Sequence, residues 1–306
     1  MSLSVGIVGL PNVGKSTLFN ALAARRLAET APHPFTTIEP HEAVVPMPDP
    51  NLAKLSDLIK PTETVPATVT FIDIAGLVKG AAQGEGLGNQ FLAKIREVSA
   101  IVHVVRVFED PNVPHVHAQI DPQEDIEVIN LELELGEIKG KPAIYVVNLN
   151  ENQLGRADEL LKTVRAVTGE APVIAVAAKM EEELSDLAPA ERREYLQQWG
   201  IAQSGLEKLI TEAYRTLDLI TFYTIKGGKE VHAWSLKRGS TALEAAGEVH
   251  TDFAKNFIKA EAISVEELLA AGGWKQAKEL GKVRLEGRDY IVQDLDVIEF
   301  KVGAAT

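Results

Sequence analysis

The sequence predicts a doubly wound α/β domain followed by a small α+β domain. A strand, a glycine-rich loop and a helix follow one another at residues 4–24. Short β-branched strands then alternate with amphipathic helices up to about Asp218, after which the order of elements changes. We therefore expect one domain over residues 1–218 and a second over residues 219–306.

The glycine-rich loop has the pattern Gly-x-x-x-x-Gly-Lys-Ser, from Gly9 to Ser16. Its glycines let backbone N–H groups curl around phosphate oxygens, and the helix that follows adds its partial positive charge. Lys15 is expected to reach the β- and γ-phosphate oxygens, and the Ser16 hydroxyl is placed for Mg²⁺. The loop residues expected to bind a nucleotide are Asn12, Val13, Gly14, Lys15, Ser16 and Thr17.

Four further apolar segments lack two-residue alternation, as expected for parallel strands that are covered on both faces. These strands are predicted at 67–73, 100–105, 143–148 and 173–177, with helices at 89–98, 125–138 and 156–168. Because ligands bind at the carboxyl ends of such strands, the site should lie at that edge of the sheet.

The second domain opens with a predicted hairpin, in which Gly227 and Gly228 separate two strand-like segments at 219–225 and 231–236. A helix at 241–249 and strand-like segments at 283–286, 290–292 and 297–300 follow. This order predicts an α+β sheet of β-grasp type.

Two segments supply candidate magnesium ligands. Asp73 begins an Asp-x-x-Gly sequence at the end of a predicted strand, where its carboxylate can hold a Mg²⁺-bound water. The loop at 34–40 carries Thr36 and Thr37, and one of them is expected to complete the Mg²⁺ shell when a γ-phosphate is present. We favour Thr37.

The tetrad Asn148-Leu149-Asn150-Glu151 stands where guanine-reading sites carry Asn-Lys-x-Asp. Glu151 is one methylene longer than the aspartate that accepts from guanine. An asparagine, which has both a donor and an acceptor, suits the mixed edge of adenine. Asn148, Leu149 and Glu151 are therefore expected to meet a purine, in a site that is not clearly built for guanine.

Composition limits the remaining possibilities. The chain has 306 residues, no cysteine and a net charge of −13, nearly all of it before residue 219. Disulfides and thiolate metal sites are excluded, and any RNA partner needs a local basic patch. Neither a signal peptide nor a membrane-spanning segment is predicted, so we expect a soluble cytoplasmic protein.

The chain resembles the YchF or Obg-like ATPases, of the Obg branch of translation-factor-type P-loop NTPases, over nearly its whole length. The matching segments are 9–20, 34–40, 46–50, 71–78, 84–89, 148–151 and 250–253. The resemblance implies ATP hydrolysis in preference to GTP, binding to the ribosome through its large subunit, and a C-terminal TGS domain of β-grasp fold. It also implies a regulatory role in translation or stress response.

The resemblance also bears on catalysis. Leu77 stands where Ras-like enzymes have the glutamine that orients water, and it is unable to do so. The resemblance implies that a loop histidine replaces it, which corresponds to His115, with His117 as the rival. Asn12 corresponds to the asparagine that holds K⁺ in monovalent-cation-dependent relatives; the alternative is a side chain that caps the loop.

One departure concerns a long helical insertion that the family usually carries. Here Lys139-Gly140-Lys141 bridges that position directly, which puts any partner contact made through the insertion in doubt. We interpret the chain as a Mg²⁺-dependent ATPase switch. The alternatives are a true GTPase of the same fold and a nucleotide-sensing binding module that does not hydrolyse nucleotide.

Overall fold

The computed structural model describes residues 3–29, 41–74, 87–116 and 119–303, and the chain divides into two compact units. One unit comprises Met1–Pro46 and Val69–Leu217, and the other comprises Met47–Thr68 and Asp218–Thr306. The predicted division assigns residues 47–68 to the first domain. That assignment is wrong, because the apolar side chains of this segment are buried in the core of the second unit.

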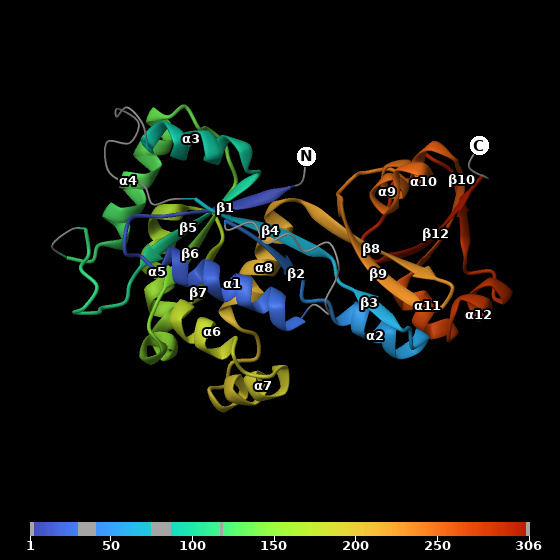
Figure 1. The fold of residues 1–306 in the computed structure, drawn as a ribbon, viewed down its shortest axis with the longest axis horizontal. Coiled ribbons are helices and arrows are strands. Elements are labelled where there is room, and N and C mark those ends of the chain that lie inside the picture. Colours follow the sequence, from blue (N-terminus) through green and yellow to red (C-terminus); the bar gives the residue numbers. More distant parts are fainter. Residues whose placement is uncertain (1–2, 30–40, 75–86, 117–118, 304–306) are drawn as a thin grey trace. The chain divides into compact units, whose positions relative to one another are not determined.

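The first unit is built on a sheet of six described strands, with helices on both faces (Figure 1). These strands are β1 (Ser4–Val8), β2 (Glu42–Pro46), β4 (Thr68–Asp73), β5 (Ala100–Arg106), β6 (Ala143–Asn148) and β7 (Val173–Val176). They lie in the order β2-β4-β1-β5-β6-β7, and β1 pairs in parallel with both β4 and β5. All five residues of β1 are buried, as the absence of alternation predicts.

The helices of the first unit are α1 (Lys15–Glu29), α3 (Leu87–Glu97), α4 (Pro122–Leu135), α5 (Ala157–Thr168), α6 (Ala178–Leu184), α7 (Pro189–Gln198) and α8 (Gly205–Thr216), with the 3₁₀ helix η1 (Glu151–Arg156) before α5. Some of them begin at a side-chain cap, as α4 and α8 do. Asp121 caps α4 by accepting from the backbone N–H groups of Gln123 and Glu124. No helix in the described ranges has the length and apolar character needed to cross a bilayer.

The second unit has its own sheet. Its strands are β3 (Glu63–Val65), β8 (Leu219–Lys226), β9 (Glu230–Lys237), β10 (Phe257–Ser264), β11 (Arg284–Glu286) and β12 (Asp296–Val302), in the order β11-β10-β12-β8-β9-β3. The hairpin of β8 and β9 forms as predicted, with Gly227 and Gly228 at φ of 57° and 68°. Its helices are α2 (Pro50–Ile59), α9 (Ala242–Val249), α10 (Thr251–Lys255), α11 (Val265–Ala271) and α12 (Trp274–Glu279).

Two predictions for this unit need correction. Residues 290–292 form no strand; Ile291 makes only an isolated bridge to Thr241. The strand β10, which pairs with both β11 and β12, was missed. Its sequence, Phe-Ile-Lys-Ala-Glu-Ala-Ile-Ser, interrupts the apolar run with charged residues. One of them, Glu261, is buried on this strand, with Oε2 2.6 Å from Nζ of Lys278.

Residues 47–68 interrupt the first unit in sequence but belong to the second. A helix cap and apolar packing hold them there. Asp49 caps α2 through the N–H groups of Asn51 and Leu52, and its other carboxylate oxygen accepts from the Tyr223 hydroxyl of β8 at 2.8 Å. Leu52 and Leu55 are buried in the core cluster that contains Tyr223. The strand β3 then pairs with β9 in parallel.

Candidate nucleotide-binding site

The phosphate loop lies between β1 and α1, where the sequence predicts it. Asn12 and Gly14 have left-handed backbones, with φ of 63° and 93°. A Cβ atom added to Gly14 would lie 2.2 Å from Nδ2 of Asn148, so only glycine fits at this point. Asn148 Nδ2 donates to the Val13 carbonyl at 2.9 Å, which joins the phosphate loop to the end of β6.

Lys15 is the buried cation of the loop. Its side chain is nearly enclosed, with 9% of the residue exposed, and Nζ donates to the Leu10 carbonyl at 2.8 Å. Burial lowers the pKa of Lys15 to about 8, an effect that the negative charge of Asp73 partly opposes. Burial, together with the charge of Lys15, also lowers the pKa of His103 on β5 to about 3, so that imidazole is neutral. The buried ammonium group of Lys15 is therefore one that an anionic ligand would stabilise.

A cavity of about 430 Å³ opens beside the loop, within the range of small-molecule sites. Its lining includes seven of the predicted residues: Asn12, Gly14, Lys15, Ser16, Thr17, Asn148 and Leu149. Val13 is buried behind the loop. The lining also includes Asn150 of the tetrad and five residues that the sequence did not single out: Phe108, Asp110, Val113, Lys179 and Glu182.

The predicted magnesium ligands are oxygen donors, which Mg²⁺ prefers. Ser16 is exposed at the start of α1 and lines the cavity, and Asp73 ends β4 close enough to influence the charge of Lys15. This donor set fits Mg²⁺ bound jointly with a phosphate. No group of three or more His, Asp or Glu side chains that would hold a metal occurs in the described part of the chain. Thr36, Thr37 and Leu77 lie outside the described residues.

Asn12, the candidate K⁺ ligand, directs its amide nitrogen to the Pro114 carbonyl at 3.0 Å. This hydrogen bond joins the phosphate loop to a residue 102 positions further along the chain, and a role of Asn12 in holding K⁺ stays a prediction.

The tetrad at 148–151 is divided between two environments. Asn148 is buried, and its side-chain oxygen accepts from the backbone N–H of Ala178 at 3.2 Å. Leu149 and Asn150 line the cavity, and Asn150 Nδ2 donates to the Glu109 carbonyl. Glu151 is not among the lining residues; its carboxylate accepts from the Tyr195 hydroxyl at 2.6 Å. In this structure the side chain that replaces the guanine-reading aspartate is thus engaged by α7.

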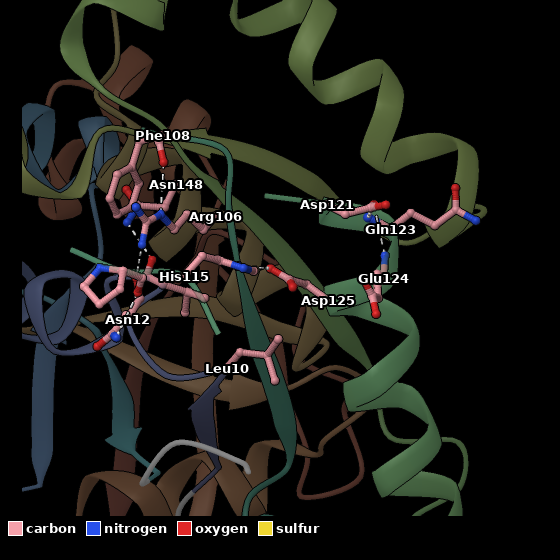
Figure 2. Close-up of polar contacts among 12 residues, drawn as sticks. Leu10, Asn12, Arg106, Phe108, His115, Asp121, Gln123, Glu124, Asp125 and Asn148 are labelled. Atoms are coloured by element: carbon pink, nitrogen blue, oxygen red, sulfur yellow. Dashed lines mark hydrogen bonds and ion pairs between the residues drawn. The ribbon is translucent and has the colours of Figure 1, made fainter. Parts of the chain in front are cut away.

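His115, the candidate catalytic residue, lies against the first turn of α4. Its Nε2 atom is 3.0 Å from Oδ2 of Asp125, and the two side chains are 5% and 2% exposed (Figure 2). His115 does not line the cavity beside the phosphate loop, although the neighbouring residue Val113 does. His117 lies outside the described residues.

Comparisons with known proteins match both parts of the chain. A family model described as "50S ribosome-binding GTPase" matches residues 4–149. The model YchF-GTPase_C, described as a protein of unknown function, matches residues 219–303. The solved structure of the Schizosaccharomyces pombe YchF GTPase superposes with a TM-score of 0.85, at 30% identity and with 98% of each chain covered.

Curated relatives extend the similarity along the chain. The ribosome-binding ATPases YchF of Bacillus subtilis strain 168 and of Escherichia coli O157:H7 are each 42% identical to it, over 98% of this chain and 99% of theirs. These alignments span 365 and 362 positions, against 306 residues here, so the relatives carry residues that fall opposite gaps in this chain.

Proposed function

The chain belongs to the YchF family of P-loop nucleotide hydrolases, and from that membership we propose that it is a Mg²⁺-dependent ATPase that acts as a nucleotide switch on the ribosome. The preference for ATP rests on which residues of the tetrad line the cavity. Asn150 lines it, whereas the Glu151 carboxylate is engaged by Tyr195. In this structure the tetrad therefore offers no carboxylate to the two donors on the edge of guanine.

In this proposal the phosphate loop and Lys15 hold the triphosphate, and Asn148 and Leu149 bound the purine. Ser16 and Thr37 would hold Mg²⁺, with Asp73 behind; when bound, the cation neutralises charge on the β- and γ-phosphate oxygens. His115 is proposed to orient the attacking water, which requires its ring to leave Asp125, since it does not line the cavity. K⁺ at Asn12 would add charge stabilisation in the transition state.

The partner in this proposal is the ribosome, through its large subunit, because the relatives named above are ribosome-binding ATPases. RNA would be contacted through a local basic patch rather than by the net charge of −13. We place the protein in the cytoplasm.

Titration of the protein with fluorescent ATP and GTP in Mg²⁺ tests the proposal directly. Tighter binding of ATP is expected, and tighter binding of GTP would favour the GTPase. Phosphate release in the presence of K⁺, measured for the native protein and for His115→Ala, separates an enzyme from a nucleotide-sensing module. A module would release no phosphate in either form. Co-sedimentation with large ribosomal subunits, with and without a non-hydrolysable ATP analogue, tests the partner.

A further inference from the structure

Arg106, the last residue of β5, places a guanidinium group between the phosphate loop and the loop that carries His115. The residue is 1% exposed. Nε donates to the Phe108 carbonyl at 3.0 Å, Nη1 to the Asn12 carbonyl at 3.2 Å and Nη2 to the Val113 carbonyl at 2.9 Å (Figure 2). One side chain thus holds three backbone carbonyls from separate places in the chain.

The charge of Arg106 is compensated in an uncommon way. A buried guanidinium is usually paired with a carboxylate. Within the described ranges, no carboxylate forms an ion pair with Arg106. Asp110 and Asp125 act on it only through their fields, and burial lowers its pKa. Its partners are instead the three carbonyl dipoles and the face of the Phe108 ring, which lies 4.3 Å from the guanidinium carbon.

We define the His115 loop as residues 107–116. Arg106 donates to the carbonyls of two residues in this loop, Phe108 and Val113, and both residues line the nucleotide cavity. A second hydrogen bond also joins the two loops: Asn12 Nδ2 donates to the carbonyl of Pro114, the residue before His115. The phosphate loop and the stem of the His115 loop are therefore joined through both the carbonyl and the side chain of Asn12.

We infer that Arg106 is a positioning residue that fixes the stem of the His115 loop against the phosphate loop, and so sets where His115 is presented to the bound nucleotide. This inference rests on the proposed ATPase function. The planar fork is essential to it, because a lysine ammonium is a single point donor that is unable to hold three carbonyls at these places.

Arg106→Lys tests the inference, since it keeps the charge and removes the fork. We expect kcat for ATP to fall about tenfold, with little change in ATP affinity, because misplacing a catalytic group costs rate rather than ground-state binding. In a His115→Ala background the same change should have no further effect on kcat. Equal effects of Arg106→Lys with and without His115 would overturn the inference, as would an unchanged kcat. Arg156→Lys, at an exposed arginine paired with Glu159, is the matched control.

Hydrogen exchange of the nucleotide-free protein tests, without relying on ATP hydrolysis, whether Arg106 holds the His115 loop. The amides of Asn112 and Val113, which are bonded to Asp110, should exchange about tenfold faster in Arg106→Lys, while amides of β7 and β8 keep their rates. Unchanged exchange in the His115 loop, or acceleration spread evenly over the first unit, would overturn the inference. If the native protein releases no phosphate but the loop alone loosens, the proposed function fails while the positioning role stands.

Discussion

His115 Nε2 lies 3.0 Å from Asp125 Oδ2, and both side chains are buried. Asp125 stands in the first turn of α4, whose start is fixed by Asp121 as the capping residue and Pro122 as the first helical residue. A carboxylate in the first turn is favoured by the helix dipole, so the acceptor for the imidazole is fixed in place. The pair turns the ring toward α4, whereas the stem of the same loop is held by Arg106 at the phosphate loop.

Asp125→Asn should therefore raise phosphate release. It keeps the shape of the side chain but removes the charge, and an ionic hydrogen bond is about twice as strong as a neutral one, so the docked ring becomes less populated. We expect roughly a fivefold increase in kcat, measured in the presence of Mg²⁺ and K⁺.

The increase should disappear in Asp125→Asn combined with His115→Ala. Asp121→Asn, which changes another aspartate at the start of α4 to an equally good cap, is the control. A lower kcat in Asp125→Asn would mean that the carboxylate orients the imidazole for catalysis instead of holding it away.

The sequence predicts well those parts of the site whose residues are near in the chain. The phosphate loop and the ends of β4 and β6 stand where the motifs put them, because each follows directly from a buried strand. The contacts that cross the chain were not predictable in the same way. Arg106 is a single arginine at the end of an apolar strand, and that charge was its only signal.

Two further contacts between distant parts of the chain are equally invisible in the local sequence. The amphipathic pattern of α2 indicates that Leu52 and Leu55 are buried, but not in which core. Nor does the tetrad indicate that Glu151 meets the hydroxyl of Tyr195, which is 44 residues further along the chain. Local patterns fix elements and loops, whereas the partner of a buried face depends on the whole fold.

Substitutions at two positions of the tetrad should shift the preference from ATP toward GTP. Leu149→Lys with Glu151→Asp restores the Asn-Lys-x-Asp pattern and offers guanine the shorter carboxylate. We expect the ratio of GTP to ATP affinity to rise by about tenfold or more, since a matched hydrogen-bonding edge discriminates strongly between bases. Tyr195→Phe, which frees the Glu151 carboxylate but leaves its longer side chain, should raise the ratio less than the double variant does. An unchanged ratio in the double variant would place base recognition elsewhere.

Because α2 packs in the core of the second unit, a cavity made by truncating one of its buried side chains should loosen that unit and not the first. Leu55 is fully buried, so Leu55→Ala should destabilise the protein by about 2–5 kcal/mol. Hydrogen exchange should accelerate in β8 and β12 and remain unchanged in β5 and β6, with ATP affinity preserved. Lys54→Ala, at an exposed position on the same helix, should have little effect. Acceleration confined to the first unit would contradict the assignment of residues 47–68.

The depressed pKa of Lys15 predicts how pH acts on the nucleotide-free protein. The folded-state value is about 8 and the unfolded value is 10.5, so between these pH values the unfolded chain binds more protons than the folded one. Stability should therefore rise as pH increases from about 8 to 10.5, because the cost of burying the charged ammonium disappears. Chemical unfolding across this range should show the rise for the native protein and not for Lys15→Met.

Nucleotide binding should depend on the same group with the opposite sign. A triphosphate favours the charged ammonium, so ATP affinity is expected to fall above pH 8, by up to about tenfold per pH unit, with a proton taken up on binding. Calorimetry at pH 9 in buffers of different ionisation enthalpy measures that uptake. Binding without proton uptake at pH 9 would mean that Lys15 is already fully charged in the empty site, and so that its burial costs less than the structure implies.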